Sequence, residues 1–154
     1  VPFFLNHKKK GFLPITDKRM TRFNITLERG VEFVQFCLKT MWGGEIFVPK
    51  ISSYRIMDLA KAVSQNCKIK IVGIRPGEKI HEEMISTNEA LNTVEFKNYF
   101  AIVPNSDFIN WDKKKYLKSH KAGKILKDDF SYNSKTNPKF LSIPEIKKLI
   151  KNFN

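Results

Sequence analysis

The sequence contains few cysteines, and the two it has, Cys37 and Cys67, lack the spacing of a zinc site or a disulfide framework. Cys37 lies in an apolar helical pattern, where a free cysteine is usually buried and chemically inert. The three histidines are far apart in the sequence, and His81 is not part of an HExxH motif. No metal centre is therefore predicted, and each histidine is expected to be a surface or structural residue.

Long apolar runs are also absent. No stretch approaches the roughly 18 apolar residues that a membrane-spanning helix requires. The chain begins at Val1 without the charged and apolar segments of a secretory signal peptide. We therefore expect a cytoplasmic chain without membrane contact, whose first residue need not be the natural start.

Acidic residues are scarce: 15 Asp and Glu against 28 Lys and Arg leave a formal net charge of +13. Such an excess is typical of nucleic-acid-binding proteins, but here it consists mostly of lysines scattered along the chain. Lys, Asn and Ile, which have AT-rich codons, are together frequent, so the base composition of the genome explains the bias. The densest cluster, at residues 113–115, is typical of a solvated face, and no nucleic acid partner is expected.

The residues that are present predict an α/β fold. A length of 154 residues and a hydrophobic fraction of 42% suit a globular domain with its own core. Periodicity predicts helices near residues 3–9, after Thr26, after Ser53, at residues 79–85 and after Ser142. Strands are predicted at residues 12–15, 45–48, 69–72 and 96–103.

The longest predicted helix lies between Thr26, a good N-cap, and the glycine pair at residues 43–44, which ends it. Its apolar residues recur at spacings of three and four, so we expect them to form one buried stripe. The stripe consists of Leu27, Val31, Val34, Leu38 and Met41.

Beyond Pro104 the pattern weakens. Residues 105–140 are polar, rich in Lys and punctuated by Asn and Gly, which predicts an extended arm. Ser142 and Glu145 then resemble a capping box. We therefore divide the chain into an α/β region at residues 1–104 and an arm with a terminal helix at residues 105–154. The apolar face of that helix consists of Ile146, Leu149, Ile150 and Phe153.

The usual catalytic constellations are missing. The sequence has no Gly-rich dinucleotide loop, no Tyr-x-x-x-Lys pair and no paired metal ligands. From the residues alone, the prediction is a ligand-binding α/β domain without assigned catalytic residues.

Two segments suggest where a ligand binds. Residues 20–23 follow a turn, and residues 75–78, Arg-Pro-Gly-Glu, directly follow a predicted strand. Arginine presents a planar, permanently charged fork that suits phosphate, and α/β proteins usually bind ligands at strand ends. A carboxylate three residues after Arg75 could accept hydrogen bonds from ribose hydroxyls. The alternative, two surface arginines in ion pairs, stays open on spacing alone.

Longer motifs occur in a definite order. They are VPFF at residues 1–4, LPITD at 13–17, RMTRF at 19–23, GGEIFVPK at 43–50, GIRPGEK at 73–79, and FSYNS, TNP and FL within 130–141. In this order they resemble the C-terminal half of UDP-N-acetylglucosamine 4,6-dehydratases, which are extended short-chain dehydrogenases/reductases. The resemblance is strongest to the C5-inverting, soluble type that opens the pseudaminic acid pathway.

The resemblance implies what a complete enzyme would do. An N-terminal Rossmann domain would bind NADP, and the enzyme would oxidise C4 of UDP-N-acetylglucosamine, eliminate water across C5 and C6, return hydride to C6 and invert C5. The cofactor site and the catalytic Lys, Tyr and Asp would all precede Val1. The chain alone is thus expected to bind no cofactor and to be inactive. Its expected partners are the missing Rossmann half and, when complete, further copies of itself in a homo-oligomer.

The resemblance also carries over a substrate-binding set. Arg75 matches the arginine that binds the diphosphate, Glu78 the acid that holds the ribose, and Arg22 an arginine near the diphosphate. The remaining members are Val1, in a substrate-contacting segment, and Pro14, Ile15 and Thr16, whose backbone is expected to meet the uracil.

Two other functions stay open. One is the membrane-bound, C5-retaining dehydratase, which shares the motif at residues 75–79, although the motifs at residues 19–23 and 47–50 favour the soluble type. The other is a basic nucleic-acid-binding module, which would need Lys and Arg gathered on one face with interleaved aromatic residues.

Overall fold

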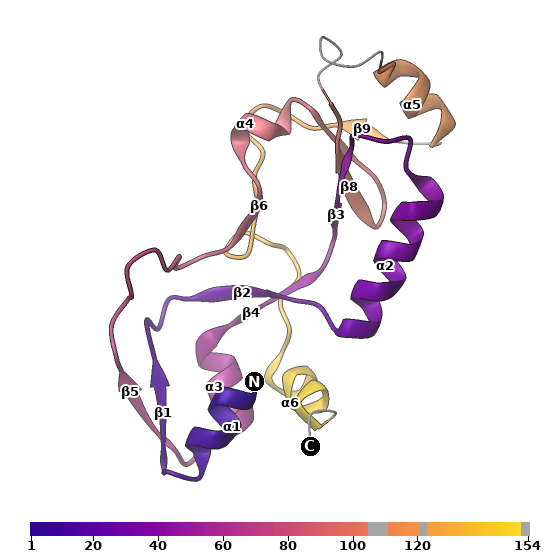
Figure 1. Ribbon diagram of the computed structural model, residues 1–154. Helices are drawn as coiled ribbons and strands as arrows, with labels where there is room; N and C mark the ends of the chain where they lie inside the picture. Colours follow the sequence, from indigo (N-terminus) through magenta and orange to yellow (C-terminus); the bar gives the residue numbers. More distant parts are fainter. Residues whose placement is uncertain (105–110, 121–122, 152–154) are drawn as a thin grey trace. The chain divides into compact units, whose positions relative to one another are not determined.

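The computed structural model describes residues 1–104, 111–120 and 123–151, and the chain forms two compact units (Figure 1). Helices and short strands alternate along the chain, so the predicted α/β class is confirmed. The predicted division at residue 104 stays a prediction. Each of the two units is assembled from segments that are distant in the sequence. Unit 1 consists of Val1–Asn24, Ser52–Glu82 and Asn133–Asn154, and unit 2 of Ile25–Ile51 and Glu83–Tyr132.

Two strand pairs form the β-structure of unit 1. β1 (Phe12–Ile15) pairs in parallel with β5 (Lys68–Ile71), and β2 (Thr21–Asn24) pairs antiparallel with β4 (Ser52–Arg55). Pro14 removes one donor from the ladder of β1, which a strand at a sheet edge tolerates. The sequence predicts β1 and β5 but not β2 and β4, because the residues of these two strands are mostly polar or charged.

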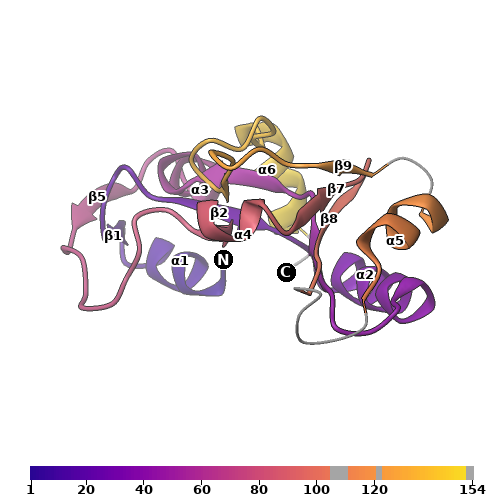
Figure 2. The same cartoon turned by 90° about the horizontal axis from the view of Figure 1, so that it is seen from above.

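Three helices cover one core in unit 1. They are α1 (Pro2–Lys8), α3 (Ile56–Val63) and α6 (Ile143–Lys151), and α6 packs against α3 (Figure 2). The predicted apolar residues of α6 contribute Ile146 and Ile150 to this core, whereas Phe153 lies outside the described residues. The buried core residues are Phe4, Leu13, Ile15, Leu59, Ala60, Val63, Ile146 and Ile150.

The capping predictions have mixed outcomes. Ser142 and Glu145 form the predicted capping box: the backbone N–H of Ser142 donates to the Glu145 carboxylate at 2.8 Å. Ser53 as the cap of α3 is wrong, because it is buried inside β4 and accepts a hydrogen bond from Asn137 Nδ2 at 2.9 Å. The N-cap of α3 is Arg55. The helix predicted at residues 79–85 is also wrong, because that segment bends at residues 80 and 81 and ends in β6 (Glu83–Ile85).

Unit 2 is built on an antiparallel sheet of order β3-β8-β7-β9. Its strands are β3 (Ile46–Pro49), β7 (Thr93–Glu95), β8 (Tyr99–Ile102) and β9 (Lys124–Ile125). The remaining elements of this part of the chain are α2 (Leu27–Thr40), α4 (Thr87–Ala90), α5 (Lys113–Ser119) and β6, which pairs with β10 (Tyr132–Asn133). A purely extended arm beyond residue 104 is therefore wrong for α5, which Asp112 caps by accepting from Lys115 N at 2.9 Å. None of the helices in the described ranges is long and apolar enough to cross a membrane.

The stripe predicted on α2 is not buried. Thr26 caps the helix as expected, accepting from the backbone N–H of Arg29 at 3.3 Å. Leu27 and Leu38, however, are 80% and 67% exposed, and no residue of α2 is fully buried. Contact with the sheet is made instead by Phe36, itself 38% exposed, whose ring centroid lies 5.0 Å from that of Tyr99 in β8. The sheet thus leaves much of the apolar surface of α2 exposed. The recurrence of apolar residues at spacings of three and four does not show which of them pack.

This exposure gives a stability prediction. Changing Leu27→Gln and Leu38→Gln together should reduce binding of an apolar dye and association of the 154-residue chain. The free energy of unfolding should change by less than about 1 kcal/mol, since both side chains are already largely exposed. The matched control is Leu59→Gln, a 5% exposed leucine whose replacement should unfold unit 1. A large loss of stability in the double variant, measured by urea unfolding, would show that the stripe is packed.

Candidate functional site

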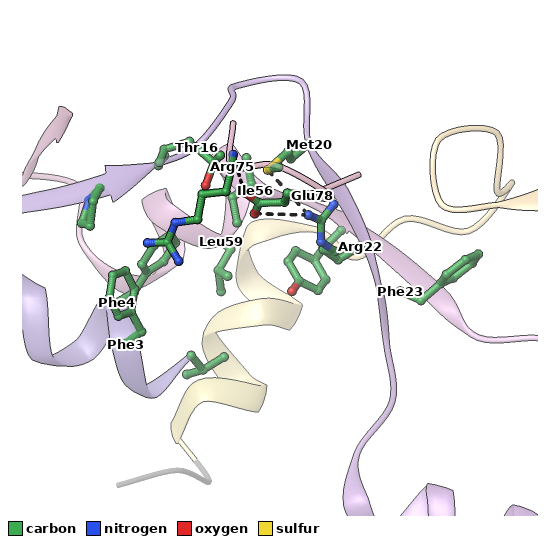
Figure 3. A pocket seen from close by; sticks show the side chains of 14 residues that line it. Phe3, Phe4, Thr16, Met20, Arg22, Phe23, Ile56, Leu59, Arg75 and Glu78 are labelled. Atoms are coloured by element: carbon green, nitrogen blue, oxygen red, sulfur yellow. Dashed lines mark hydrogen bonds and ion pairs between the residues drawn. The ribbon is translucent and has the colours of Figure 1, made fainter. Parts of the chain in front are cut away.

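A cavity of about 480 Å³ lies within unit 1, at the ends of β1 and β2 and beside α1 and α3 (Figure 3). All seven residues that the resemblance selected line it, although they come from separate parts of the sequence. The lining consists of Val1, Phe3, Phe4, Pro14, Ile15, Thr16, Met20, Arg22, Phe23, Tyr54, Ile56, Leu59, Arg75 and Glu78. Their role in binding stays a prediction, but their convergence in one cavity is an observation.

The Arg-Pro-Gly-Glu segment forms a tight turn at the edge of this cavity. The backbone N–H of Glu78 donates to the carbonyl of Arg75 at 3.0 Å, which closes the turn. Gly77 adopts a φ of 79°, a left-handed conformation that glycine enters without a steric penalty. The Glu78 carboxylate also accepts from the backbone N–H of Arg75 at 3.4 Å. These two hydrogen bonds therefore keep Arg75 and Glu78 close to each other in a fixed backbone geometry.

Arg75 is the unneutralised positive charge of the site. Its residue is exposed, and in the described part of the chain its guanidinium forms no salt bridge. Figure 3 shows the side chain extending toward Phe4, while Glu78 turns toward Arg22. A guanidinium in this state has its full fork of donors available for an anionic ligand.

Arg22 is in a different state, because protein atoms surround its guanidinium. It donates to the carbonyls of Thr21 at 2.8 Å, Ile80 at 3.0 Å and Lys79 at 2.9 Å. Its Nε lies 3.2 Å from the carboxylate of Glu82, and its Nη2 lies 3.9 Å from that of Glu78. The two acids offset its charge, so Arg22 holds the chain that follows the turn more than it faces the cavity.

The rest of the lining is largely apolar and, apart from Met20 and Phe23 in the segment at residues 20–23, was not predicted from the sequence. Tyr54 lines the cavity because it lies opposite Arg22 in the register of β2 and β4. Burial raises the pKa of Tyr54, so its phenol stays protonated at neutral pH and can donate a hydrogen bond. Phe3 and Phe4 are brought in by α1, adjacent to Val1. No local sequence signal identifies such residues, because their place depends on strand pairing and helix packing.

Unit 2 contains a second cavity, of about 540 Å³, lined mainly by aromatic residues of α2 and the β7–β8 turn. None of the residues selected from the sequence lies there. Among the described residues, no group of three His, Cys, Asp or Glu side chains could hold a metal ion. The cavity of unit 1, with its paired charges and apolar walls, is therefore the better candidate for a polar ligand.

Comparison with known proteins agrees with the motifs. Residues 1–104 match the family model described as polysaccharide biosynthesis protein. The chain belongs to this family. The predicted resemblance is confirmed by two relatives named UDP-N-acetylglucosamine 4,6-dehydratase (inverting), from Campylobacter jejuni subsp. jejuni serotypes O:2 and O:23/36. They are 48% and 46% identical to this chain over 97% of its length.

The structural comparison gives the same placement. The X-ray structure of Pen from Bacillus thuringiensis matches 99% of this chain with a TM-score of 0.77 and 28% sequence identity. The chain covers 46% of each Campylobacter relative and 45% of Pen, so it spans about half the length of the proteins that it matches. The two Campylobacter relatives favour the inverting type over the alternatives left open by the sequence.

Proposed function

We propose that this chain is the nucleotide-sugar-binding part of an inverting UDP-N-acetylglucosamine 4,6-dehydratase. The whole protein would form a UDP-4-keto-6-deoxy-hexosamine for surface glycan or pseudaminic acid biosynthesis. The observation that carries the proposal is the cavity of unit 1, where Arg75, which forms no salt bridge within the described ranges, and a nearby carboxylate share one edge. The identity of 48% to an enzyme of that name supports the substrate.

The roles within the cavity follow from the chemistry of each group. Arg75 would bind the diphosphate, because a guanidinium matches phosphate oxygens with charge-assisted hydrogen bonds. Glu78 would accept hydrogen bonds from the ribose hydroxyls, and Arg22, whose charge Glu78 and Glu82 offset, would lie near the diphosphate. The backbone of Pro14, Ile15 and Thr16 would meet the uracil, and Val1 would lie beside the sugar.

We propose that the redox chemistry is supplied by residues outside these 154. In the described residues the parallel pair β1–β5 is not followed by a Gly-rich turn opening a helix, which NADP binding of the Rossmann type requires. The residues present therefore do not fit this cofactor, and we assign no catalytic step to them. NADP, the catalytic groups and homo-oligomeric assembly belong to the proposal for the whole cytoplasmic protein.

The 154-residue chain alone is expected to be inactive. Incubation with NADP and UDP-N-acetylglucosamine should give no 4-keto product, because hydride transfer and elimination would lack an acceptor and a base. The measurement is chromatography of the sugar nucleotides, with a complete dehydratase as the positive control. Formation of the 4-keto sugar by the chain alone would contradict the assignment of the chemistry to other residues.

Binding experiments separate the proposed function from its alternatives. UDP should bind the protein at its natural length with modest salt dependence, whereas a nucleic-acid module would bind duplex DNA with an affinity that falls steeply as salt rises. The C5 configuration of the product would distinguish an inverting enzyme from a retaining one. Binding of DNA but not UDP would exclude the nucleotide-sugar proposal.

A further inference from the structure

Hydrogen bonds on both sides of the Arg-Pro-Gly-Glu turn hold it in place, and each of these two sets of bonds is called an anchor here. Residues 73–77 are exposed, so the core does not fix their position. On one side, the backbone N–H of Val72 donates to the carbonyl of Ile15 at 2.9 Å, which continues the β1–β5 ladder. On the other side, residues 79–82 form neither helix nor strand and are held by hydrogen bonds to other segments of unit 1. The direction in which Arg75 and Glu78 point therefore depends on how well these two ends are held.

β2 forms the first half of the second anchor. The backbone N–H of Thr21 donates to the carbonyl of Ile80 at 3.1 Å, and the Arg22 guanidinium donates to the carbonyls of Ile80 and Lys79. The Nε of the same guanidinium pairs with Glu82 at 3.2 Å. One arginine thus binds three parts of the segment that leaves the turn, and its donors are used by protein acceptors.

A buried serine from the C-terminal part of the chain forms the second half. The backbone N–H of Ser134 donates to the carbonyl of Glu82 at 2.7 Å, and the Ser134 hydroxyl accepts from the backbone N–H of Glu82 at 2.9 Å. The same hydroxyl lies 2.7 Å from Thr21 Oγ1, which lies 2.8 Å from His81 Nδ1. Ser134 is 0% and Thr21 5% exposed, so water does not compete for these bonds.

The imidazole of His81 is suited to hydrogen bonding with the Thr21 hydroxyl. Burial and nearby positive charges lower the pKa of His81. The ring is therefore neutral at pH 7 and offers one nitrogen that accepts and one that donates. Buried hydroxyls that satisfy each other in this way fix a conformation, and removal of one leaves its partners without water to replace it.

We propose that Thr21, Arg22 and Ser134 are positioning residues of the nucleotide site. They hold residues 79–82 in place so that the preceding turn presents Arg75 and Glu78 to one ligand. Arg22 acts through the backbone of this segment, and Ser134 makes residues beyond 132 necessary for nucleotide binding. The inference rests on the proposed function of the turn, but it concerns residues whose polar atoms contact the protein.

The test compares two substitutions at Thr21 in the protein at its natural length. Thr21→Val keeps the shape of the side chain and removes the hydroxyl, and it should weaken UDP binding by about 10-fold. Thr21→Ser keeps the hydroxyl and should recover most of the affinity. Ser134→Ala should weaken binding to a similar degree, and it tests the same network of hydroxyls if the valine variant does not fold. UDP affinity is measured by calorimetry at fixed salt.

A structural control separates positioning from general stability. Ile150→Val removes a methyl group from the core of unit 1, away from the turn, and should lower the melting temperature while leaving UDP affinity within about twofold. In turnover by the natural-length protein, Thr21→Val should raise KM for the UDP-sugar with little change in kcat, since a nucleotide contact is equally strong in ground and transition states.

Each outcome has a distinct meaning. Wild-type affinity in Thr21→Val or Ser134→Ala would overturn the positioning inference and leave the proposed function intact. An equal loss in Thr21→Val and Thr21→Ser would also overturn it, because the hydroxyl would not be the cause. No binding of UDP by the wild-type protein, or unchanged binding in Arg75→Ala, would instead contradict the proposed function.

Discussion

Arg75→Ala is expected to weaken UDP binding by about 10- to 150-fold, equivalent to roughly 1.5–3 kcal/mol for a charge-assisted hydrogen bond. The effect should be large because Arg75 has no salt bridge in the described part of the chain and lies at the edge of the cavity. Its removal would leave the diphosphate without its principal cation. The measurement is calorimetric titration of the natural-length protein with UDP at fixed ionic strength.

Control variants test whether the loss of affinity is specific to the guanidinium of Arg75. Arg75→Lys should recover little affinity, because an ammonium cannot reproduce the planar fork. Glu78→Gln should cost less than Arg75→Ala, since an amide oxygen still accepts one hydrogen bond. Arg29→Ala removes an exposed arginine of unit 2 and should leave affinity unchanged apart from weak, salt-screened effects. Equal affinity of wild type and Arg75→Ala would make Arg75 an ordinary surface residue.

Gly123→Ala is expected to destabilise unit 2 by about 1–3 kcal/mol, the usual cost of overpacking a core. A Cβ at this position would lie 2.5 Å from Val94 Cγ1, 2.8 Å from Phe96 Cε1 and 2.9 Å from Leu117 Cδ2. Val94 is 0% exposed, and its β-branched side chain has few alternative rotamers with which to move away from the new methyl group. Urea unfolding of the 154-residue chain, followed by tryptophan fluorescence, reports this change because Trp111 belongs to the same core.

Gly30→Ala is the matched control, with an effect of opposite sign. Gly30 lies inside α2, and a Cβ there would have no heavy atom within 4 Å. The substitution should stabilise the helix by about 0.5–1 kcal/mol, because alanine loses less conformational entropy than glycine. If Gly123→Ala proves as harmless as Gly30→Ala, the core around Val94 is looser than its contacts indicate.

Local signals along the chain determined much of the fold. The hydroxyl of Thr26 and the pair Ser142–Glu145 cap their helices as predicted, because capping depends on residues three positions apart. β1 is recognisable as a short apolar run after Gly11, and β5 as an alternation of lysine and isoleucine shortly before Gly73. The motifs also identified the family and the residues of the candidate site, since a run such as residues 73–79 contains its own turn and charges.

Tertiary structure decided what these local signals could not. The spacing of α2 predicts a buried apolar stripe, but the ring of Phe36 contacts the sheet of unit 2 instead, because burial depends on where the neighbouring element lies. Ser53 has the chemistry of a cap, yet strand pairing places it inside β4, where Asn137 satisfies its oxygen.

The two arginines of the candidate site also differ in a way that the sequence alone does not predict. Nothing local in the sequence distinguishes Arg22 from Arg75 as a ligand for phosphate. Only the fold brings the carbonyls of residues 79 and 80 and the carboxylate of Glu82 to Arg22, while Arg75 stays unneutralised among the residues that the structure describes. Residue type sets which hydrogen bonds a side chain can form. Which of them it does form depends on partners from distant parts of the sequence, and these become neighbours only when the chain folds.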